Sequence, residues 1–166
     1  MRLSFLPKLI APSLPALTAA FLKEKNIQLL MLDFDNTIVP YTTSVATPEM
    51  DAWLKKMLSS DIAVCVVSNS HNDRVEIFCG HYVMDCITHA KKPFRKGISQ
   101  CLKKYRIPAS QAALAGDQIF TDTLGANGCG VKPILVKAIN NHNFWLKARH
   151  VLELPFIYAA RKRKIS

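Results

Sequence analysis

Four of the twelve acidic residues in this 166-residue sequence lie at or shortly after the ends of two apolar runs of the chain. Asp33 and Asp35 follow the first run, and Asp117 and Asp122 follow the second. Because residues two apart in an extended chain face the same way, Asp33 and Asp35 present both carboxylates on one side. Four acids brought together repel one another unless a cation is present, and carboxylate oxygens are hard ligands that suit Mg²⁺. The pattern predicts a Mg²⁺ site to which Asp117 supplies a further oxygen.

Phosphoryl transfer is the chemistry that such a site would serve. A metal ion would offset the negative charge of the acids and of a phosphoryl group, which accounts for most of the barrier to that reaction. One Asp can attack phosphorus and form an aspartyl-phosphate, while a second protonates the leaving oxygen and later activates water. Ser68 and Asn69, which follow a further apolar run, can donate hydrogen bonds to phosphoryl oxygens, and Lys91 or Lys92 can neutralise them.

The elements that position these residues are apolar runs alternating with helical patterns. The expected strands are Ile27–Leu32, Ile62–Val67, Tyr82–Ile87, Ala112–Ala115 and Ile134–Val136. Helices are expected after Thr47, over Asp73–Phe78 and after Pro93. The alternation predicts an α/β fold, a three-layer Rossmann-like sandwich with a mainly parallel five-stranded sheet. Ligands of such sheets bind beyond the carboxyl ends of the strands, where the polar residues of this sequence gather.

Four motifs in this order resemble those of the haloacid dehalogenase-like (HAD) phosphatases. The sequence DFDNT at residues 33–37 is similar to the first motif of that family, and Ser68-Asn69 is similar to the second. Lys92 corresponds to the third motif, and GDQIFTD at residues 116–122 corresponds to the acidic fourth motif. The resemblance implies a HAD-like phosphatase.

This resemblance implies catalytic roles for the matched residues. Asp33 would be the nucleophile and Asp35 the general acid and base. Ser68 would bind the substrate phosphate with Asn69 beside it, and Lys92 would neutralise its charge. The acid at position 35 favours phosphatase chemistry, because dehalogenating members of the superfamily lack it.

The same resemblance implies a ligand set for the metal. Mg²⁺ would be held by Asp33, by the backbone carbonyl of Asp35 and by Asp117. Asp122 would lie behind these ligands and bond to Lys92 or to a metal-bound water.

Longer matching stretches resemble the YqeG-like branch of HAD subfamily III. These are DFDNTIVP, VVSNS, the Lys92-Pro93 pair and GDQIFTD, and the match spans roughly residues 20–140. Members of this branch are similar to the phosphatidylglycerophosphate (PGP) phosphatases of mitochondria and plastids, which implies PGP, an anionic lipid headgroup, as the substrate. The intervals between the motifs are too short to hold a separate cap domain, and resemblance to other capless members implies an open site.

We expect a single domain over residues 1–166. Its parts are an N-terminal segment (1–25), a catalytic core (26–140), and a C-terminal helix with a basic tail (141–166). The longest uncharged run in the N-terminal segment, Leu9–Leu22, has 14 residues, whereas a span of a bilayer needs about 20. We therefore interpret this segment as neither a membrane span nor a cleaved signal.

Composition and charge indicate the compartment and the type of partner. The five cysteines form no CxxC pair, which favours a reducing, cytoplasmic compartment over a disulfide framework or a zinc site. The net charge of +10 suggests an anionic partner. The basic tail Arg161–Lys164 suggests peripheral contact with the inner membrane face, for which apolar insertion by the N-terminal segment would also be needed. The sequence leaves the oligomeric state open.

Alternatives of three kinds remain open. The substrate could be a phosphoprotein or a nucleotide. A phospho-accepting receiver module also uses paired acids with a Ser and a Lys, but it needs its acceptor at the end of the third strand, whereas Asp33 ends the first. A nucleic-acid-binding module would explain the charge, but the sequence has no recognition motif and no aromatic stacking run, so we do not expect nucleic acid as a partner.

Overall fold

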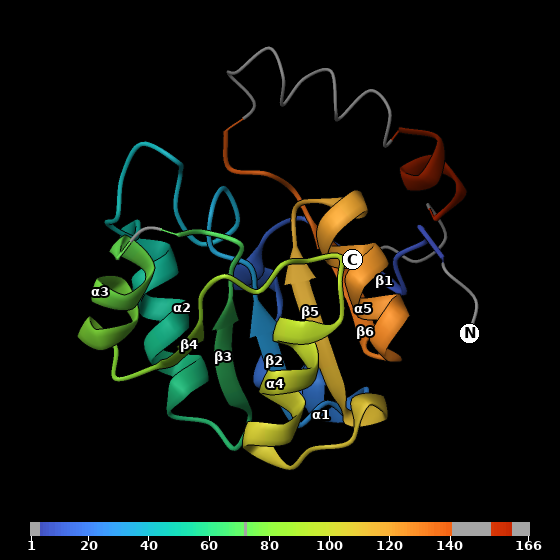
Figure 1. Cartoon of the computed structure of the whole chain (residues 1–166). Coiled ribbons are helices and arrows are strands. Elements are labelled where there is room, and N and C mark those ends of the chain that lie inside the picture. The colour runs from blue at the N-terminus through green and yellow to red at the C-terminus, as the bar shows by residue number, and fades with distance from the viewer. Residues whose placement is uncertain (1–3, 72, 141–153, 161–166) are drawn as a thin grey trace.

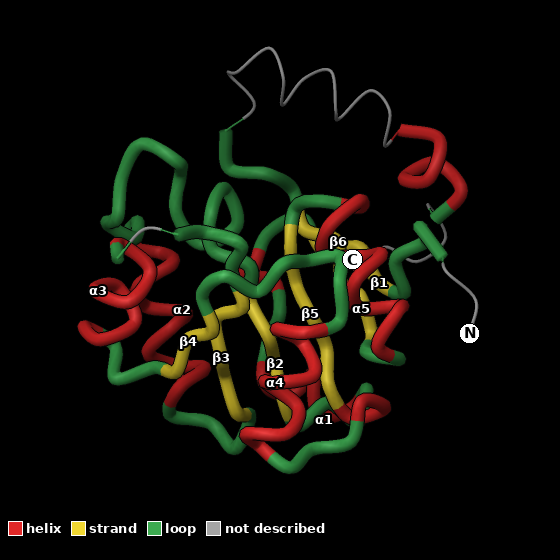
Figure 2. Tube along the Cα trace, in the orientation of Figure 1, coloured by secondary structure: helices red, strands yellow, loops and turns green. Residues whose placement is uncertain are grey.

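A computed structural model of the chain describes residues 4–71, 73–140 and 154–160. Its six strands form one entirely parallel sheet in the order β1-β6-β5-β2-β3-β4 (Figures 1 and 2). The strands are β1 (Leu9–Ala11), β2 (Leu29–Leu32), β3 (Ala63–Val67), β4 (Asp85–Ile87), β5 (Ala112–Gly116) and β6 (Lys132–Val136). The predicted α/β fold with a parallel sheet is confirmed.

Helices cover both faces of the sheet and complete the three layers (Figure 1). They are α1 (Ala19–Glu24), α2 (Pro48–Leu58), α3 (Arg74–His81), α4 (Lys96–Tyr105) and α5 (Leu124–Cys129), with 3₁₀ turns η1 (Leu14–Ala16) and η2 (Ala109–Gln111) and the π-helical turn η3 (Ile119–Thr123). Apolar residues of α1, α2 and α3 pack with one face of the sheet, and those of α4 and α5 pack with the other. Alternate residues of β2 enter the two cores, Leu30 and Leu32 on one side and Met31 on the other.

Helix α2 illustrates how the sequence builds one of these layers. Thr47 caps its first turn, the Thr47 hydroxyl accepting a hydrogen bond from the Met50 amide, and Pro48 occupies the first helical position. Trp53 and Leu54 are buried on the face towards the sheet, and the Trp53 indole donates a hydrogen bond to the Leu17 carbonyl. This bond ties α2 to the N-terminal segment.

The prediction of five strands was wrong by one, because the N-terminal segment contributes the edge strand β1. Its residues pair in register with Ile134–Val136 of β6. The strand is only three residues long and lies between Pro7 and Pro12, so it carries too little periodicity to be recognised. Leu14, Leu17 and Leu22 of this segment are buried in the core. These three side chains are therefore not available for insertion into a membrane.

Two elements begin later in the structure than the sequence predicts, because a turn precedes each of them. The strand expected over Tyr82–Ile87 begins only at Asp85, because the preceding chain turns at Val83, whose φ is 52°. Helix α4 begins at Lys96, after a turn that contains the cis Lys92-Pro93 bond.

Part of the predicted C-terminal helix is seen at residues 154–159. Phe156 packs against Phe5 and Phe120, with ring centroids 5.1 and 6.4 Å away. The remainder of that helix and the basic tail Arg161–Lys164 lie outside the described residues. Within the described part of the chain, no helix has the length and apolar character needed to cross a membrane.

Candidate active site

Three neighbouring strands deliver the predicted site residues to one edge of the sheet. Asp33 directly follows β2, and its amide donates to the Ala115 carbonyl of β5 at 2.9 Å. Asp117 directly follows β5, and Ser68 directly follows β3. Since all three strands are parallel, their carboxyl ends bring these residues together.

Lys92 forms the centre of a buried charge cluster. Its ammonium nitrogen lies 2.7 Å from Asp33 Oδ1 and 2.7 Å from Asp122 Oδ1, with 1% of the side chain exposed. Burial alone would lower the pKa of Lys92, but the charges of Asp122 and Asp33 outweigh it, so the pKa lies above its usual value. Burial raises the pKa of Asp122, and the Lys92 ammonium opposes that shift. Asp122 therefore bonds to Lys92, which is one of the two partners that the resemblance implies for it.

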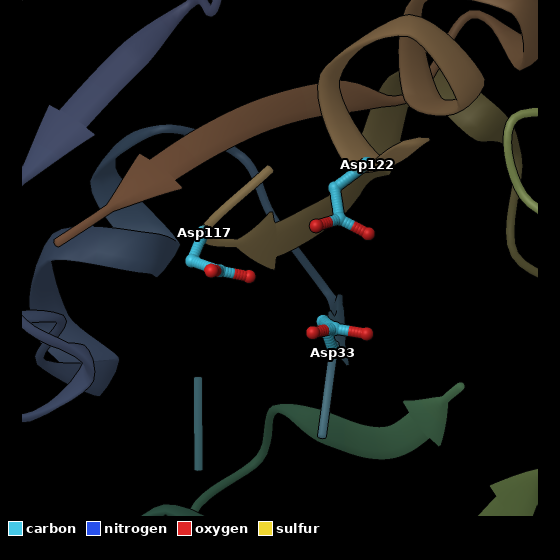
Figure 3. Close-up of side chains that lie close together, drawn as sticks. All are labelled: Asp33, Asp117 and Asp122. Atoms are coloured by element: carbon cyan, nitrogen blue, oxygen red, sulfur yellow. The ribbon is translucent and has the colours of Figure 1, made fainter. Parts of the chain in front are cut away.

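Three buried carboxylates converge at this point, those of Asp33, Asp117 and Asp122 (Figure 3). An oxygen from each lies within 4.8 Å of the other two. Asp122 accepts hydrogen bonds at both oxygens, at Oδ1 from Lys92 and at Oδ2 from the Gln118 amide at 3.2 Å. The Lys92 ammonium offsets one of the three charges, and a divalent cation held by Asp33 and Asp117 would offset the other two. The donor set therefore fits a divalent metal ion.

The hydroxyl of Thr37 lies between the two candidate metal ligands. It is 3.2 Å from Asp33 Oδ2 and 3.3 Å from Asp117 Oδ1, and it accepts a hydrogen bond from the Asp117 amide. A hydroxyl has one hydrogen to donate, so it can satisfy only one of these carboxylates at a time. Thr37 thus contacts both carboxylates and can donate to either one.

Asn36 connects the segment after β6 to the same loop. It is completely buried, with φ at 64°, a left-handed conformation that Asn tolerates better than most residues. Its side-chain oxygen accepts from the Asn140 amide at 2.8 Å, and its carbonyl accepts from the Ile139 amide at 3.0 Å. Its side-chain nitrogen donates to Asp117 at 3.4 Å. Sequence reasoning gave Asn36 no role, and the signal available was its place inside the first motif.

Asp35 faces Arg74, a residue that sequence reasoning missed. Arg74 Nη1 lies 2.9 Å from Asp35 Oδ1, and the guanidinium lies over the Phe34 ring at 5.1 Å. The same guanidinium donates to the carbonyls of Pro40 and Thr43. Burial raises the pKa of Asp35, Arg74 opposes the shift, and the charge of Asp33 adds to it. A basic residue at the start of a helix, where acids are preferred, was the signal that could have identified Arg74.

Asn69 holds the loop that carries Lys92. Its side-chain nitrogen donates to the Lys92 carbonyl at 2.9 Å, and its oxygen accepts from the Lys92 amide at 2.7 Å. The second hydrogen of that nitrogen is still able to donate, so phosphate binding by Asn69 remains a prediction. Ser68 is buried beside it, and its hydroxyl accepts from the Ser70 amide at 3.0 Å.

The fold is shared with solved structures of a phosphatase and of a hydrolase. The cobalt-bound deoxy-D-mannose-octulosonate 8-phosphate phosphatase of Haemophilus influenzae has a TM-score of 0.56 at 15% identity, covering 85% of this chain and 93% of that one. A putative HAD subfamily III A hydrolase of Legionella pneumophila has a TM-score of 0.54 at 13% identity, covering 86% and 88%. The parallel sheet with helices on both faces is thus the α/β fold of these proteins.

Sequence comparison places the chain more narrowly. The family model described as mitochondrial PGP phosphatase matches residues 1–139, and the chain belongs to that family. It is also 30% identical over 160 residues to the probable phosphatase YqeG of Bacillus subtilis, covering 96% of this chain and 93% of that protein. The chain is accordingly a phosphatase of the HAD superfamily, as the motifs predict.

Proposed function

We propose that this phosphatase is a Mg²⁺-dependent phosphomonoesterase that hydrolyses PGP through an aspartyl-phosphate at Asp33. The observation that carries the mechanism is the Asp33 carboxylate, buried at the carboxyl edge of the sheet with the Lys92 ammonium 2.7 Å away. Family membership supports the choice of substrate.

In the first step, a carboxylate oxygen of Asp33 bonds to phosphorus as the bond from phosphorus to the leaving alcohol breaks. Asp35, whose pKa is raised by burial, gives a proton to the leaving oxygen. Lys92 offsets charge on the phosphoryl group, and Ser68 binds its oxygens. Mg²⁺, when bound by Asp33, Asp117 and the Asp35 carbonyl, supplies further charge neutralisation at the phosphoryl oxygens.

In the second step, Asp35 removes a proton from water. The resulting nucleophile attacks the phosphorus of the aspartyl-phosphate, the bond from Asp33 to phosphorus breaks, and inorganic phosphate leaves. Asp33 and Asp35 return to their starting states, so the cycle consumes only the phosphomonoester and water.

The test is Mg²⁺-dependent phosphate release from PGP in mixed micelles, with a soluble aryl phosphate and an Asp33→Asn variant alongside. Hydrolysis of PGP far above that of the aryl phosphate, lost in the variant by roughly 10⁴-fold or more, is the expected result. Turnover of the aryl phosphate alone would remove the lipid assignment. An Asp33→Asn variant as active as the wild type would exclude the covalent step. Thermal unfolding of the variant shows whether a loss of activity comes from the missing nucleophile or from misfolding.

A further inference from the structure

The loop that places Lys92 in the site also presents an exposed surface. The Phe94 amide donates to the Lys91 carbonyl at 2.8 Å, closing a turn around Lys92-Pro93. This turn directs Lys92 inward, where 5% of the residue is exposed, while Phe94 is 74% exposed. Lys91, Arg95 and Lys96 are exposed as well. We call Lys91, Phe94, Arg95 and Lys96 the rim loop.

The charges of the rim loop do not stabilise the fold. Among the described residues, none of Lys91, Arg95 and Lys96 takes part in an ion pair. Arg95 and Lys96 stand at the start of α4, where positive charge is unfavourable next to the helix dipole. An exposed phenylalanine between such residues contributes nothing to the core.

The sequence around the rim loop keeps acids away from it. Between residues 86 and 152 there are eleven Lys and Arg, and the only acidic residues are Asp117 and Asp122, both of which are buried in the site. Nine of these basic residues lie in the described range 86–140, and this excess of positive charge attracts anions. An apolar side chain surrounded by unpaired basic ones matches the surface of a bilayer that contains anionic lipids, since the ring enters the interface and the charges meet the headgroups.

We propose that the rim loop docks this enzyme on an anionic lipid bilayer, with Phe94 inserted between headgroups and the three basic side chains in contact with them. This inference rests on the proposed function and deepens it. Because Lys92 belongs to the same loop, docking brings the site to the level of the headgroups. A phosphomonoester at the end of a lipid headgroup could then reach Lys92 and Asp33 without leaving the bilayer.

The test is sedimentation of the full chain with vesicles of phosphatidylcholine, alone or with phosphatidylglycerol added. This assay needs no turnover, so its outcome is separate from that of the PGP hydrolysis assay. Wild type should bind the anionic vesicles and not the neutral ones. Phe94→Ser should weaken binding roughly tenfold, and Phe94→Leu should preserve it because the apolar side chain remains. The double variant Arg95→Ser/Lys96→Ser should weaken binding by about 20-fold or more, at roughly fivefold per charge.

Matched controls lie away from the site. Val83→Ser removes an exposed apolar side chain from the turn before β4, and Lys56→Ser/Lys103→Ser removes the same charge from the last turns of α2 and α4. Each control should change binding less than twofold. Equal losses in the controls and the rim loop variants would overturn the proposal in favour of diffuse attraction to the whole surface. Wild-type binding by the rim loop variants, or no binding by the wild type, would overturn it too.

Discussion

The buried charge cluster around Lys92 and the exposed rim loop use charge in opposite ways. In the cluster, the buried Lys92 ammonium forms ion pairs with Asp33 and Asp122, each at 2.7 Å. One residue earlier in the chain, Lys91 is exposed, and no ion pair of Lys91 is found among the described residues. A buried charge must be paired because its desolvation is costly, whereas an exposed charge costs little and remains available to a partner. Two neighbouring lysines can thus have unrelated functions, and burial distinguishes them.

The acids of the buried cluster differ in their hydrogen-bond partners. Asp122 has both oxygens occupied by Lys92 and the Gln118 amide. Asp33 and Asp117 face each other across the Thr37 hydroxyl. We interpret Asp122 as the residue that orients Lys92, and Asp33 and Asp117 as the residues that meet the metal.

The largest effect should separate these two kinds of acid. Asp117→Asn should lower aryl phosphate turnover on the order of 10³-fold at a fixed Mg²⁺ concentration, because a bound metal contributes several kcal/mol of charge stabilisation. Added Mg²⁺ should restore part of this loss. Asp122→Asn should also lower turnover, and added Mg²⁺ should not restore it. Titration of activity with Mg²⁺ measures both, and identical Mg²⁺ responses of the two variants would contradict the assignment.

The second prediction compares the stability of variants at the two lysines. Lys92→Met leaves two carboxylates buried without their partner and should lower the free energy of unfolding by about 3–5 kcal/mol. Lys91→Met, at an exposed position, should change it by less than about 0.5 kcal/mol. Urea denaturation in the presence of a chelator gives both values without a contribution from metal. A loss below about 1 kcal/mol for Lys92→Met would mean that the cluster is not held by this ion pair.

The sequence predicted the site residues best where they follow the strands of the parallel sheet. Asp33, Ser68 and Asp117 could be placed together because parallel strands end at one edge, so a polar residue after each apolar run must lie at that edge. The edge strand β1 could not be recognised, because three residues between prolines carry no usable pattern. Its place in the sheet comes from pairing with β6, which lies more than a hundred residues away in the sequence.

Contacts between loops could not be predicted from the sequence, for a different reason. The bond from Asn140 to Asn36 and the contacts of Arg74 depend on the paths of loops, and no periodicity determines those paths. The residue types at the starts of two helices were nevertheless informative. Arg74 at the start of α3, like Arg95 and Lys96 at the start of α4, stands where a helix prefers an acid. In both loops the unfavourable local position coincides with a contact or a surface that we assign to function.

The smallest predicted effect concerns Arg74, which connects Asp35 to the loop 40–44. Arg74→Lys keeps the charge, but a single ammonium cannot reach Asp35 and the carbonyls of Pro40 and Thr43 together. The unfolding free energy should fall by about 1 kcal/mol, and turnover of an alkyl phosphate should fall roughly tenfold because Asp35 is less well held.

The choice of leaving group shows whether Arg74 acts through Asp35. An alkyl alcohol leaves poorly without a proton, whereas an aryl alcohol leaves readily as its anion. If Arg74 positions Asp35 as the acid, Arg74→Lys should reduce turnover of glycerol phosphate more than turnover of the aryl phosphate. Asp35→Asn should show the same selectivity to a greater degree. Equal losses on both substrates would assign Arg74 to the structure of the loop alone, because general loosening of the site does not discriminate between leaving groups.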